Sequence, residues 1–169
     1  SEDLLTTNGG RGGVSEGELA VSADGAIAGL RARIVCPLGT ALVNSGFEFP
    51  AKKITVNLAP ADLPKGGAAY DLPIAVGILI ASGAFDWSET DTEAIYYGEL
   101  SLDGSLRHTK GALLAGEFAN RQKRTLFLPI LCANEAAVFE AISVIPLRNI
   151  EELVRHLSKE KLIKALKPI

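Results

Sequence analysis

The sequence has few cysteines, and their spacing is not that of a metal site. Cys36 and Cys132 are the only two, and they lie far apart in the chain. No CxxC pair and no cysteine–histidine ligand spacing is present, so the sequence indicates neither a zinc site nor a disulfide scaffold. We therefore expect a reduced, cytoplasmic setting.

Long apolar runs, a secretory signal and an excess of positive charge are also missing. The longest apolar run, residues 72–81, is far shorter than the roughly 20 residues that span a bilayer, so we expect a soluble chain with no membrane partner. The acidic N-terminus lacks the pattern of a signal peptide. The net charge of -3 over 169 residues gives no long-range attraction to nucleic acid.

The charge and composition vary along the chain. Residues 1–30 carry five acids against one arginine, whereas residues 155–167 carry five bases against one glutamate. We predict a flexible arm at 1–17, a folded domain at 18–158 and a basic C-terminal tail at 159–169. The single GGRGG stretch in the arm is similar to RGG tails that bind nucleic acid, but we favour a plain linker, because one copy is a weak signal and the composition alone explains disorder.

The central part of the chain has the composition of a globular domain, with 47% hydrophobic and 22% charged residues. Alternating apolar residues predict two strands between 18 and 36, and further strands at 53–58, 94–102, 106–108, 125–128 and 144–147. Cap and stop signals predict helices at 37–44, 72–82, 111–120, 135–142 and 151–157, with Asp71, Asn134 and Asn149 as N-caps. This alternation predicts an α/β fold or an α+β sandwich.

The helix at 72–82 has no charged side chain within its apolar part, so we expect the sheet to cover it. The predicted core consists of Ile54, Val56, Leu58, Ile74, Ile78, Leu79, Leu114, Phe127 and Leu128.

No phosphate-binding loop is recognisable. A Walker A loop needs GxxxxGK[ST], because its lysine must reach the phosphates and its hydroxyl the magnesium ion. Neither GGRGGVSEG nor PKGGAAYD supplies this pattern. In the second, Lys65 lies on the wrong side of its glycines. We therefore expect no cofactor-binding and no metal-binding residue in this chain.

Nucleophilic catalysis needs a hydroxyl or thiol beside a base, and the entrance of the predicted helix at 72–82 has neither. Alanines stand there at 68 and 69. Asp71 could act as a general base, but an N-cap stabilises a helix by about 1 kcal/mol, and we favour that role. We expect His108 to have a surface or structural role and His156 to be solvated. The sequence thus predicts no catalytic residue.

Six basic residues are candidates for interaction with a polyanion: Lys52, Lys53, Lys65, Arg121, Lys123 and Arg124. Lysine and arginine side chains that share a face can contact phosphates. The alternative is that they are solvated ends of strands and helices. We favour this alternative because no aromatic residues alternate with the basic ones.

Two stretches carry a family resemblance. NSGFEFPAKKITVNLAPADLPKGGAAYDLPIAVGILIASG (44–83) closely resembles the N-terminal region of the Mg-chelatase-like AAA+ ATPases of the ComM/YifB competence-protein family. YYGELSLDGSLRHTKGALLAGEFA (96–119) is similar to the second half of the same domain, as are TLFLP and NIEELVRHL further on. The resemblance covers roughly 41–158, and we do not find it in the first 40 residues.

The resemblance implies a ribosomal protein S5 domain 2-like fold, as in the proteolytic domain of Lon and the C-terminal domain of RadA. In Lon proteases the loop reads PKDGPSAG, and its serine is the nucleophile. Here Pro64, Lys65 and Gly67 match that loop, but the serine position is Ala69. The position of the Lon lysine falls near Leu113. Lys110 is close by, but it precedes the helix.

Both halves of a serine–lysine dyad are therefore missing. The resemblance implies a non-catalytic interaction domain, followed in the longer protein by an ATPase module that binds ATP and Mg²⁺. It also implies a ring, such as a hexamer, that acts as a branch-migration motor in DNA processing, with DNA as a possible partner. Two alternatives remain: a Lon-like peptidase with a displaced dyad, and a nucleic-acid-binding module.

Overall fold

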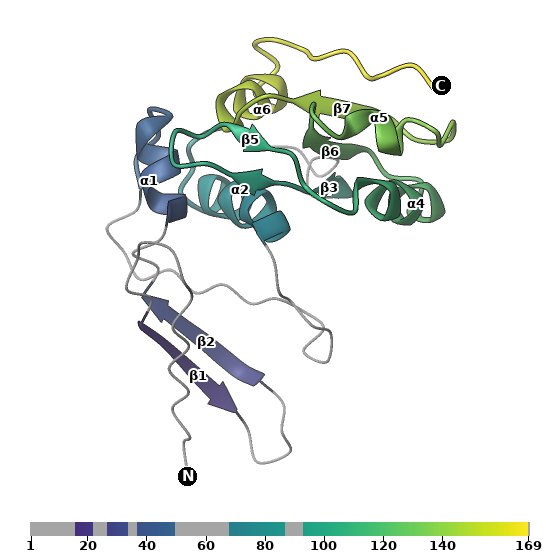
Figure 1. Ribbon diagram of the computed structural model, residues 1–169. Coiled ribbons are helices and arrows are strands. Elements are labelled where there is room, and N and C mark those ends of the chain that lie inside the picture. The colour runs from purple at the N-terminus through teal and green to yellow at the C-terminus, as the bar shows by residue number, and fades with distance from the viewer. Residues whose placement is uncertain (1–15, 22–26, 34–36, 50–67, 87–92, 169) are drawn as a thin grey trace.

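The computed structural model describes residues 16–21, 27–33, 37–49, 68–86 and 93–168 (Figure 1). The predicted strand at 53–58, with Ile54, Val56 and Leu58, lies outside these residues, as do Lys52, Lys53 and Lys65.

The first elements follow the sequence prediction. β1 (Glu16–Val21) pairs antiparallel with β2 (Ile27–Arg33), and the register shifts at the end of β1. Helix α1 (Pro37–Asn44) comes next, and Gly46 follows it with a φ of +84°. This left-handed conformation favours glycine, so the predicted stop signal is confirmed.

A three-stranded parallel sheet forms the centre of the domain. Its order is β3 (Ile95–Tyr96), β6 (Leu126–Pro129) and β7 (Val144–Leu147). Parallel neighbours need crossover connections, and helices α4 (Ala112–Gln122) and α5 (Ala133–Ala136) lie in the two crossovers. The middle strand β6 is buried along its whole length, which explains its uninterrupted apolar sequence LFLP.

The sheet separates two hydrophobic clusters. Phe127, in β6, belongs to the first cluster, whereas its neighbours Leu126 and Leu128 belong to the second. Successive side chains of a strand point to opposite faces, so β6 contributes to both layers. The first cluster contains residues of α1, α2 (Asp71–Ala81) and α6 (Ile150–Leu157), and the second contains residues of α4 and α5. The predicted mixed α/β architecture is thereby confirmed.

The segment predicted as one strand, 94–102, is divided in the structure. β3 joins the parallel sheet, whereas β4 (Glu99–Leu100) pairs antiparallel with β5 (Leu106–Arg107) in a hairpin around Asp103-Gly104. The division falls at Gly98, where an added Cβ would lie 3.0 Å from Leu106 Cδ2. The pairing of β4 with β5 confirms the hairpin, and the prediction of a single strand over 94–102 was wrong.

Helix α2 begins after the short 3₁₀ helix η1 (Ala68–Tyr70). It buries side chains on several sides, and Leu72, Ala75 and Leu79 are fully covered. The helix packs against α1, β3 and β4, so the predicted buried helix beneath strands is confirmed. Of the predicted core, Ile78, Phe127 and Leu128 are buried as well, and Ile74 packs at the edge of the first cluster.

Two predictions in the second half of the chain were wrong. Leu114 is 68% exposed, because α4 faces the domain with its small residues instead. The helix expected at 135–142 is only α5, whose N-cap is Cys132 and not Asn134. Cys132 N–H donates to Pro129 O immediately after β6, and this turn brings the chain into a helix before Asn134 is reached.

The end of the chain is packed on the domain. Asn149 caps α6 as predicted, since its Oδ1 accepts a hydrogen bond of 2.8 Å from Glu152 N–H. After α6, Ile163 N–H donates to His156 Nδ1, and Leu166 N–H donates to Val144 O. The prediction that His156 is solvated was wrong, because its half-buried ring also meets Phe127 edge to face.

No helix in the part of the chain that the structure describes has the length and apolar character needed to cross a membrane.

Candidate functional site

The Lon resemblance directs attention to two positions, Ala69 at the entrance of α2 and Leu113 at the start of α4. The segment Tyr97-Gly98 connects these two regions. Gly98 N–H donates to Ala69 O, and Leu72 N–H donates back to Gly98 O, each at 3.0 Å. The Tyr97 hydroxyl donates to Lys110 O at 2.6 Å. The entrance of α2 and Lys110, which shortly precedes α4, are therefore both hydrogen-bonded to the Tyr97-Gly98 segment.

The side chains at this junction are poorly suited to nucleophilic catalysis. Ala69 offers only a methyl group, and Leu113 is 49% exposed. Gly111, between Lys110 and α4, has a φ of +93°, and a Cβ there would lie 2.9 Å from the Tyr97 oxygen. The Tyr97 hydroxyl thus occupies the space beside the entrance of α4, and it is committed to a backbone carbonyl.

Two titratable groups near this junction, the Tyr97 hydroxyl and the Cys132 thiol, have a raised pKa. Burial raises the pKa of the Tyr97 hydroxyl, and Cys132 and Tyr70 add to the effect. Burial also raises the pKa of the Cys132 thiol, against a backbone hydrogen bond from Thr109. Only a thiolate is strongly nucleophilic. Cys132 is 2% exposed and near Pro129 O, so it has the surroundings of a structural cysteine.

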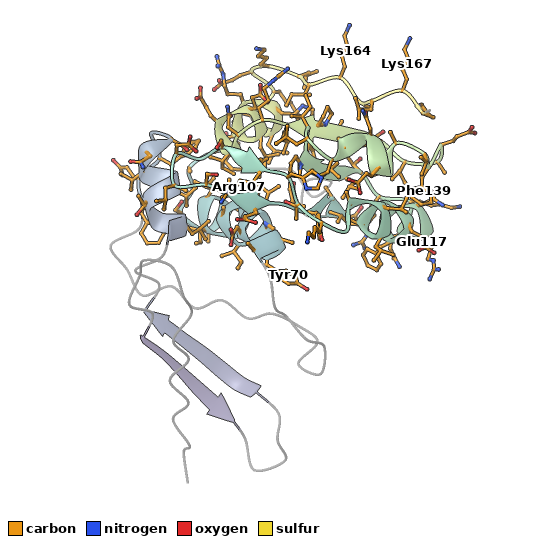
Figure 2. The ribbon with its side chains drawn as sticks, in the orientation of Figure 1. Tyr70, Arg107, Glu117, Phe139, Lys164 and Lys167 are labelled. Atoms are coloured by element: carbon orange, nitrogen blue, oxygen red, sulfur yellow. The ribbon has the colours of Figure 1, made fainter. Side chains whose placement is uncertain are left out.

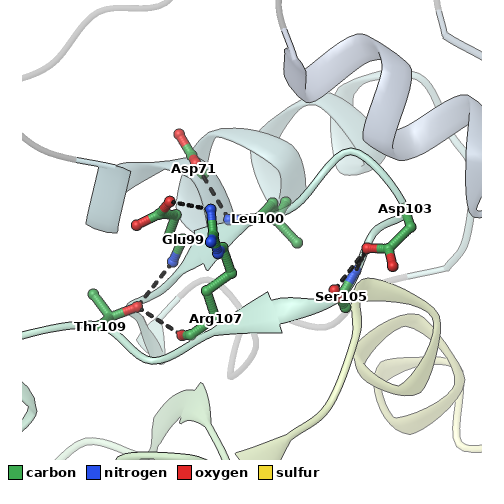
Figure 3. Close-up of polar contacts among 7 residues, drawn as sticks. All are labelled: Asp71, Glu99, Leu100, Asp103, Ser105, Arg107 and Thr109. Atoms are coloured by element: carbon green, nitrogen blue, oxygen red, sulfur yellow. Dashed lines mark hydrogen bonds and ion pairs between the residues drawn. The ribbon is translucent and has the colours of Figure 1, made fainter. Parts of the chain in front are cut away.

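Asp71 is the most perturbed carboxyl group among the described residues. Its Oδ2 accepts a hydrogen bond of 3.2 Å from Leu100 N–H (Figure 3). Burial raises its pKa from 3.8 to about 6; the Leu100 hydrogen bond opposes this rise, and the charge of Glu99 adds to it. A carboxyl group with such a pKa suits proton transfer near neutral pH.

The structure gives Asp71 a different structural role from the predicted N-cap. The N-cap of α2 is Tyr70, which makes no side-chain capping bond, and Asp71 is the first residue of the helix. The carboxylate turns to the backbone of β4 because Leu100 N–H offers a donor there. Asp71 therefore fastens α2 to the hairpin.

A polar network extends from Asp71 through the hairpin (Figure 3). Buried Thr109 accepts a hydrogen bond from Glu99 N–H and donates one to Arg107 O. The Arg107 guanidinium lies 3.5 Å from the Glu99 carboxylate. At the turn, Asp103 accepts from both the N–H and the hydroxyl of Ser105, and these bonds lower the pKa of Asp103. The network holds the hairpin in shape.

Half of the predicted basic candidates can be placed. Arg121, Lys123 and Arg124 are exposed at the end of α4. Arg121 forms an ion pair with Glu117, and Lys123 ends the helix with a φ of +54°. Arg124 N–H donates to Ala119 O. The three exposed residues thus lie together at the end of α4. This position is compatible with both interpretations, a solvated helix end and a contact with phosphate.

The expectation that ATP and Mg²⁺ are bound outside this chain stays a prediction, and one observation on metal ligands can be made of the described residues. They contain no group of three or more histidine, cysteine or acidic side chains that could hold a metal ion. His108 lies on the surface, with Nε2 3.6 Å from Glu135 Oε1, and this position agrees with its predicted surface role.

Sequence reasoning missed Tyr97 and Thr109. Tyr97 donates to Lys110 O and Thr109 accepts from Glu99 N–H, and both partners are distant in the sequence. The only local signal for Tyr97 was the YYGEL stretch that begins the second part of the resemblance.

The structure described above is a mixed α/β domain in which η1, with Ala68 and Ala69, leads into the buried helix α2. Residues 14–131 match the family described as subunit ChlI of Mg-chelatase, and the chain belongs to this family. The match begins well before residue 41, so the expectation that the first 40 residues lie outside the resemblance was wrong.

Individual relatives agree with this assignment. The chain is 51% identical to the uncharacterized protein YifB of Salmonella typhimurium over 89 residues, which are 53% of this chain and 17% of that protein. It is 48% identical to the competence protein ComM of Haemophilus influenzae over 99 residues, 59% of this chain and 19% of ComM. The uncharacterized protein Rv2897c of Mycobacterium tuberculosis is 33% identical over 114 residues, 67% of this chain and 22% of Rv2897c. The chain thus spans about a fifth of the length of these relatives.

Proposed function

We propose that this chain is a non-catalytic interaction domain of a Mg-chelatase-like AAA+ ATPase of ComM type, with an S5 domain 2-like fold. The observation that supports the proposal is the junction between η1 and α4. The two positions that carry the Lon dyad correspond to Ala69 and Leu113, and neither side chain can act as a nucleophile or a base. A fold shared with a protease does not bring the activity with it.

The rival peptidase function needs a serine that is activated by Lys110 or Lys65. The hydroxyls of Ser45 and Ser82 donate to backbone carbonyls one turn earlier in their helices. The hydroxyl of Ser105 donates to Asp103. A hydroxyl bonded to a backbone carbonyl, as in Ser45 and Ser82, is poorly placed to attack a substrate, because a carbonyl oxygen is no base for catalysis.

A peptidase assay tests the proposal. The purified chain is incubated with fluorescein-labelled casein and with unstructured peptides, and we expect no cleavage above the buffer blank. Lys110→Ala is the diagnostic variant, and Lys161→Ala is a matched exposed lysine elsewhere. Cleavage by the wild type that Lys110→Ala abolishes and Lys161→Ala retains would refute the non-catalytic role.

The rest of the proposal concerns the longer protein. ATP and Mg²⁺ would be bound by a separate ATPase module of the same polypeptide, which would form a ring such as a hexamer in the cytoplasm and act on DNA in recombination or transformation. Support comes from the family and from a relative named for competence. A GxxxxGK[ST] motif in the reading frame after this domain would agree with the proposal.

Nucleic-acid binding by this domain itself is the second candidate function. Its support is the basic C-terminal segment, where Lys164 and Lys167 are exposed and point away from the domain (Figure 2). With a net charge of -3, binding would have to come from local contacts, and each phosphate contact contributes a salt slope of about -0.9. We therefore expect weak binding that falls steeply with salt.

Titration of labelled single- and double-stranded DNA at two salt concentrations distinguishes the two functions. The test variant replaces Arg121, Lys123, Arg124, Lys164 and Lys167 with alanine. The control replaces Arg107 and Arg148, two exposed arginines outside both basic segments that form ion pairs with glutamates. Sub-micromolar binding at physiological salt that only the test variant loses would make this a DNA-binding module in its own right.

A further inference from the structure

After α6 the chain turns back and runs along the outside of the domain past β7 (Figure 1). Residues 159–168 make up this segment, which we name the C-terminal strap. The turn lies at Lys159, whose φ of +62° is uncommon for a residue other than glycine. The N–H groups of Glu160 and Lys161 both donate to Arg155 O at 3.0 Å. The strap therefore leaves α6 in a fixed direction.

Farther along, two backbone N–H groups of the strap donate to the domain. Ile163 N–H donates to His156 Nδ1, and Leu166 N–H donates to Val144 O, each at 2.9 Å. The side chains of Ile163 and Leu166 pack against the first and the second hydrophobic cluster respectively. Leu162, beside Ile163, is 70% exposed, so the strap lies on the surface of the domain and does not enter its core.

The two hydrogen bonds differ in their dependence on pH. Val144 O is a backbone carbonyl and accepts at any pH at which the chain is folded. A backbone N–H can only donate, so the bond from Ile163 needs a lone pair on His156 Nδ1 and hence a neutral ring. A protonated imidazole carries a hydrogen on both nitrogens and has no acceptor. Imidazoles ordinarily change charge near pH 6.5, within the range from about pH 5 to about pH 8.

The imidazole of His156 packs against aromatic rings from the sheet. It meets Phe127, in β6, edge to face with ring centroids 5.5 Å apart, and Tyr96, in β3, stacks on Phe127 at 5.1 Å. Phe127 is uncharged, and Tyr96 contributes a hydroxyl. A rotation of the protonated ring would not restore the bond to Ile163, because Nε2 then carries a hydrogen as well.

Charged side chains of α6 and of the strap lie around this contact. Three acids are each paired with an arginine: Glu151 and Glu160 with Arg155, and Glu152 with Arg148. Lys161 of the strap lines the same surface hollow as Ile163 and Arg155. These six side chains carry equal numbers of negative and positive charges. A protonated His156 therefore gives the region a net positive charge beside a basic strap, which adds to the loss of the hydrogen bond.

We propose that His156 is a pH-dependent clasp: its neutral imidazole holds the C-terminal strap on the domain, and protonation of the imidazole releases the strap from Ile163 onward. In the released state the exposed side chains of Lys164 and Lys167 (Figure 2) no longer follow a fixed path. Val144 O, in the outer strand of the sheet β3-β6-β7, then loses its donor. The clasp depends on bonds within this chain alone, so it does not rest on the proposed function.

A titration by nuclear magnetic resonance tests the clasp. The isotope-labelled 169-residue chain is followed from about pH 8 to about pH 5, and the imidazole C–H signals report the protonation of each histidine. The chain has two histidines, His108 and His156, so one substitution assigns both signals. We expect the Ile163 amide signal to shift with the same midpoint as the His156 ring. The heteronuclear NOE of residues 163–167 should fall in the same transition, because a released backbone moves on the nanosecond timescale.

Two variants of His156 fix the clasp in one state. His156→Asn offers an acceptor oxygen at about the position of Nδ1 and does not titrate, so the strap should stay ordered across the whole range. His156→Leu has no acceptor, so the NOE of the strap should be low at every pH. Two control variants remove the other groups that titrate near the same pH: His108→Asn, and Asp71→Asn, whose carboxyl group has a pKa of about 6. Both controls should leave the Ile163 transition unchanged.

Thermal unfolding of each variant checks that the domain is folded, and the wild-type and His156→Asn titrations decide the matter even if His156→Leu does not fold. The proposal is overturned if the Ile163 amide and the strap NOE stay unchanged while the His156 ring titrates. It is also overturned if the strap transition persists in His156→Asn, or if it disappears in His108→Asn or Asp71→Asn, because another group then controls the strap.

Discussion

Asp71 Oδ2 lies 3.2 Å from the backbone nitrogen of Leu100, and this hydrogen bond joins the first turn of α2 to strand β4. The carboxyl group is partly buried and close to the charge of Glu99, so its pKa rises to about 6 in the folded chain. The group that fastens the helix to the hairpin therefore changes its charge just below neutral pH.

Asp71→Asn tests this arrangement, because the amide oxygen keeps the acceptor and removes the charge. Folding raises the pKa from 3.8 to about 6, so the folded state binds the proton more tightly. The contribution of Asp71 to stability then falls as the pH rises from about 4 to about 6. The full shift corresponds to about 3 kcal/mol, and we halve it, to about 1.5 kcal/mol, because solvent screens a partly exposed group.

Urea unfolding of the wild type and of Asp71→Asn at pH 4.5 and pH 7.5 measures the effect. The variant should gain stability relative to the wild type between the two pH values, by about 1 kcal/mol after the lost helix-dipole interaction is allowed for. A variant that loses stability relative to the wild type over this interval would show that the ionised carboxylate stabilises the fold.

Ile78 and Leu114 test which apolar residues form the core. Ile78, in α2, is 6% exposed, whereas Leu114, in α4, is 68% exposed. Ile78→Ala should destabilise the chain by roughly 2 to 5 kcal/mol, because it removes buried methyl groups and leaves a cavity. Leu114→Ala should change the free energy of unfolding by less than about 0.5 kcal/mol. Chemical denaturation of both variants checks this. Equal losses in the free energy of unfolding would mean that Leu114 is buried and that α4 presents a different face to the core.

Gly116 and Gly77 form a second matched pair, since both are helical glycines. Alanine normally favours a helix by about 1 kcal/mol over glycine. At Gly77 an added Cβ meets nothing within 4 Å, whereas at Gly116 it would lie 2.9 Å from Ala136 Cβ. Gly77→Ala should therefore stabilise the chain by up to about 1 kcal/mol, and Gly116→Ala should destabilise it by about 1 to 3 kcal/mol. A stabilising Gly116→Ala would contradict the close packing of α4 on α5.

Elements with a strong local signal could be predicted from the sequence. The strand at 144–147 and the hairpin at Asp103-Gly104 depend on apolar runs and turn residues that act within a few positions. The wrong predictions depend on contacts between distant segments. Leu114 was predicted to be buried because it is a leucine in a helix, but the fit of Gly116 against Ala136 decides which face of α4 turns inward.

The candidate site shows the same limit. Ala69 and Leu113 could be identified from the sequence, because the family motif fixes their positions. The bond from Tyr97 to Lys110 O and that from Leu100 N–H to Asp71 could not. Each joins a side chain to a backbone group in a different element, and no local pattern marks such a pair.

The two asparagines predicted as N-caps provide the last test, because the structure confirms one and rejects the other. Asn149 Oδ1 accepts a hydrogen bond from Glu152 N–H, and the Glu152 carboxylate accepts one of 2.9 Å from Arg148 N–H. Asn134 is an exposed residue within α5 and caps nothing there. Asn149→Ala leaves an N–H of the first turn of α6 without its acceptor, so it should cost about 1 kcal/mol.

Asn134→Ala should be neutral or slightly stabilising, since alanine has the higher helix propensity. A loss of 1 kcal/mol lowers the melting temperature of a chain of this size by about 2 to 4 °C. Thermal unfolding followed by circular dichroism can therefore separate the two variants. A loss for Asn134→Ala as large as that for Asn149→Ala would mean that a helix begins at residue 135, as the sequence pattern alone predicts.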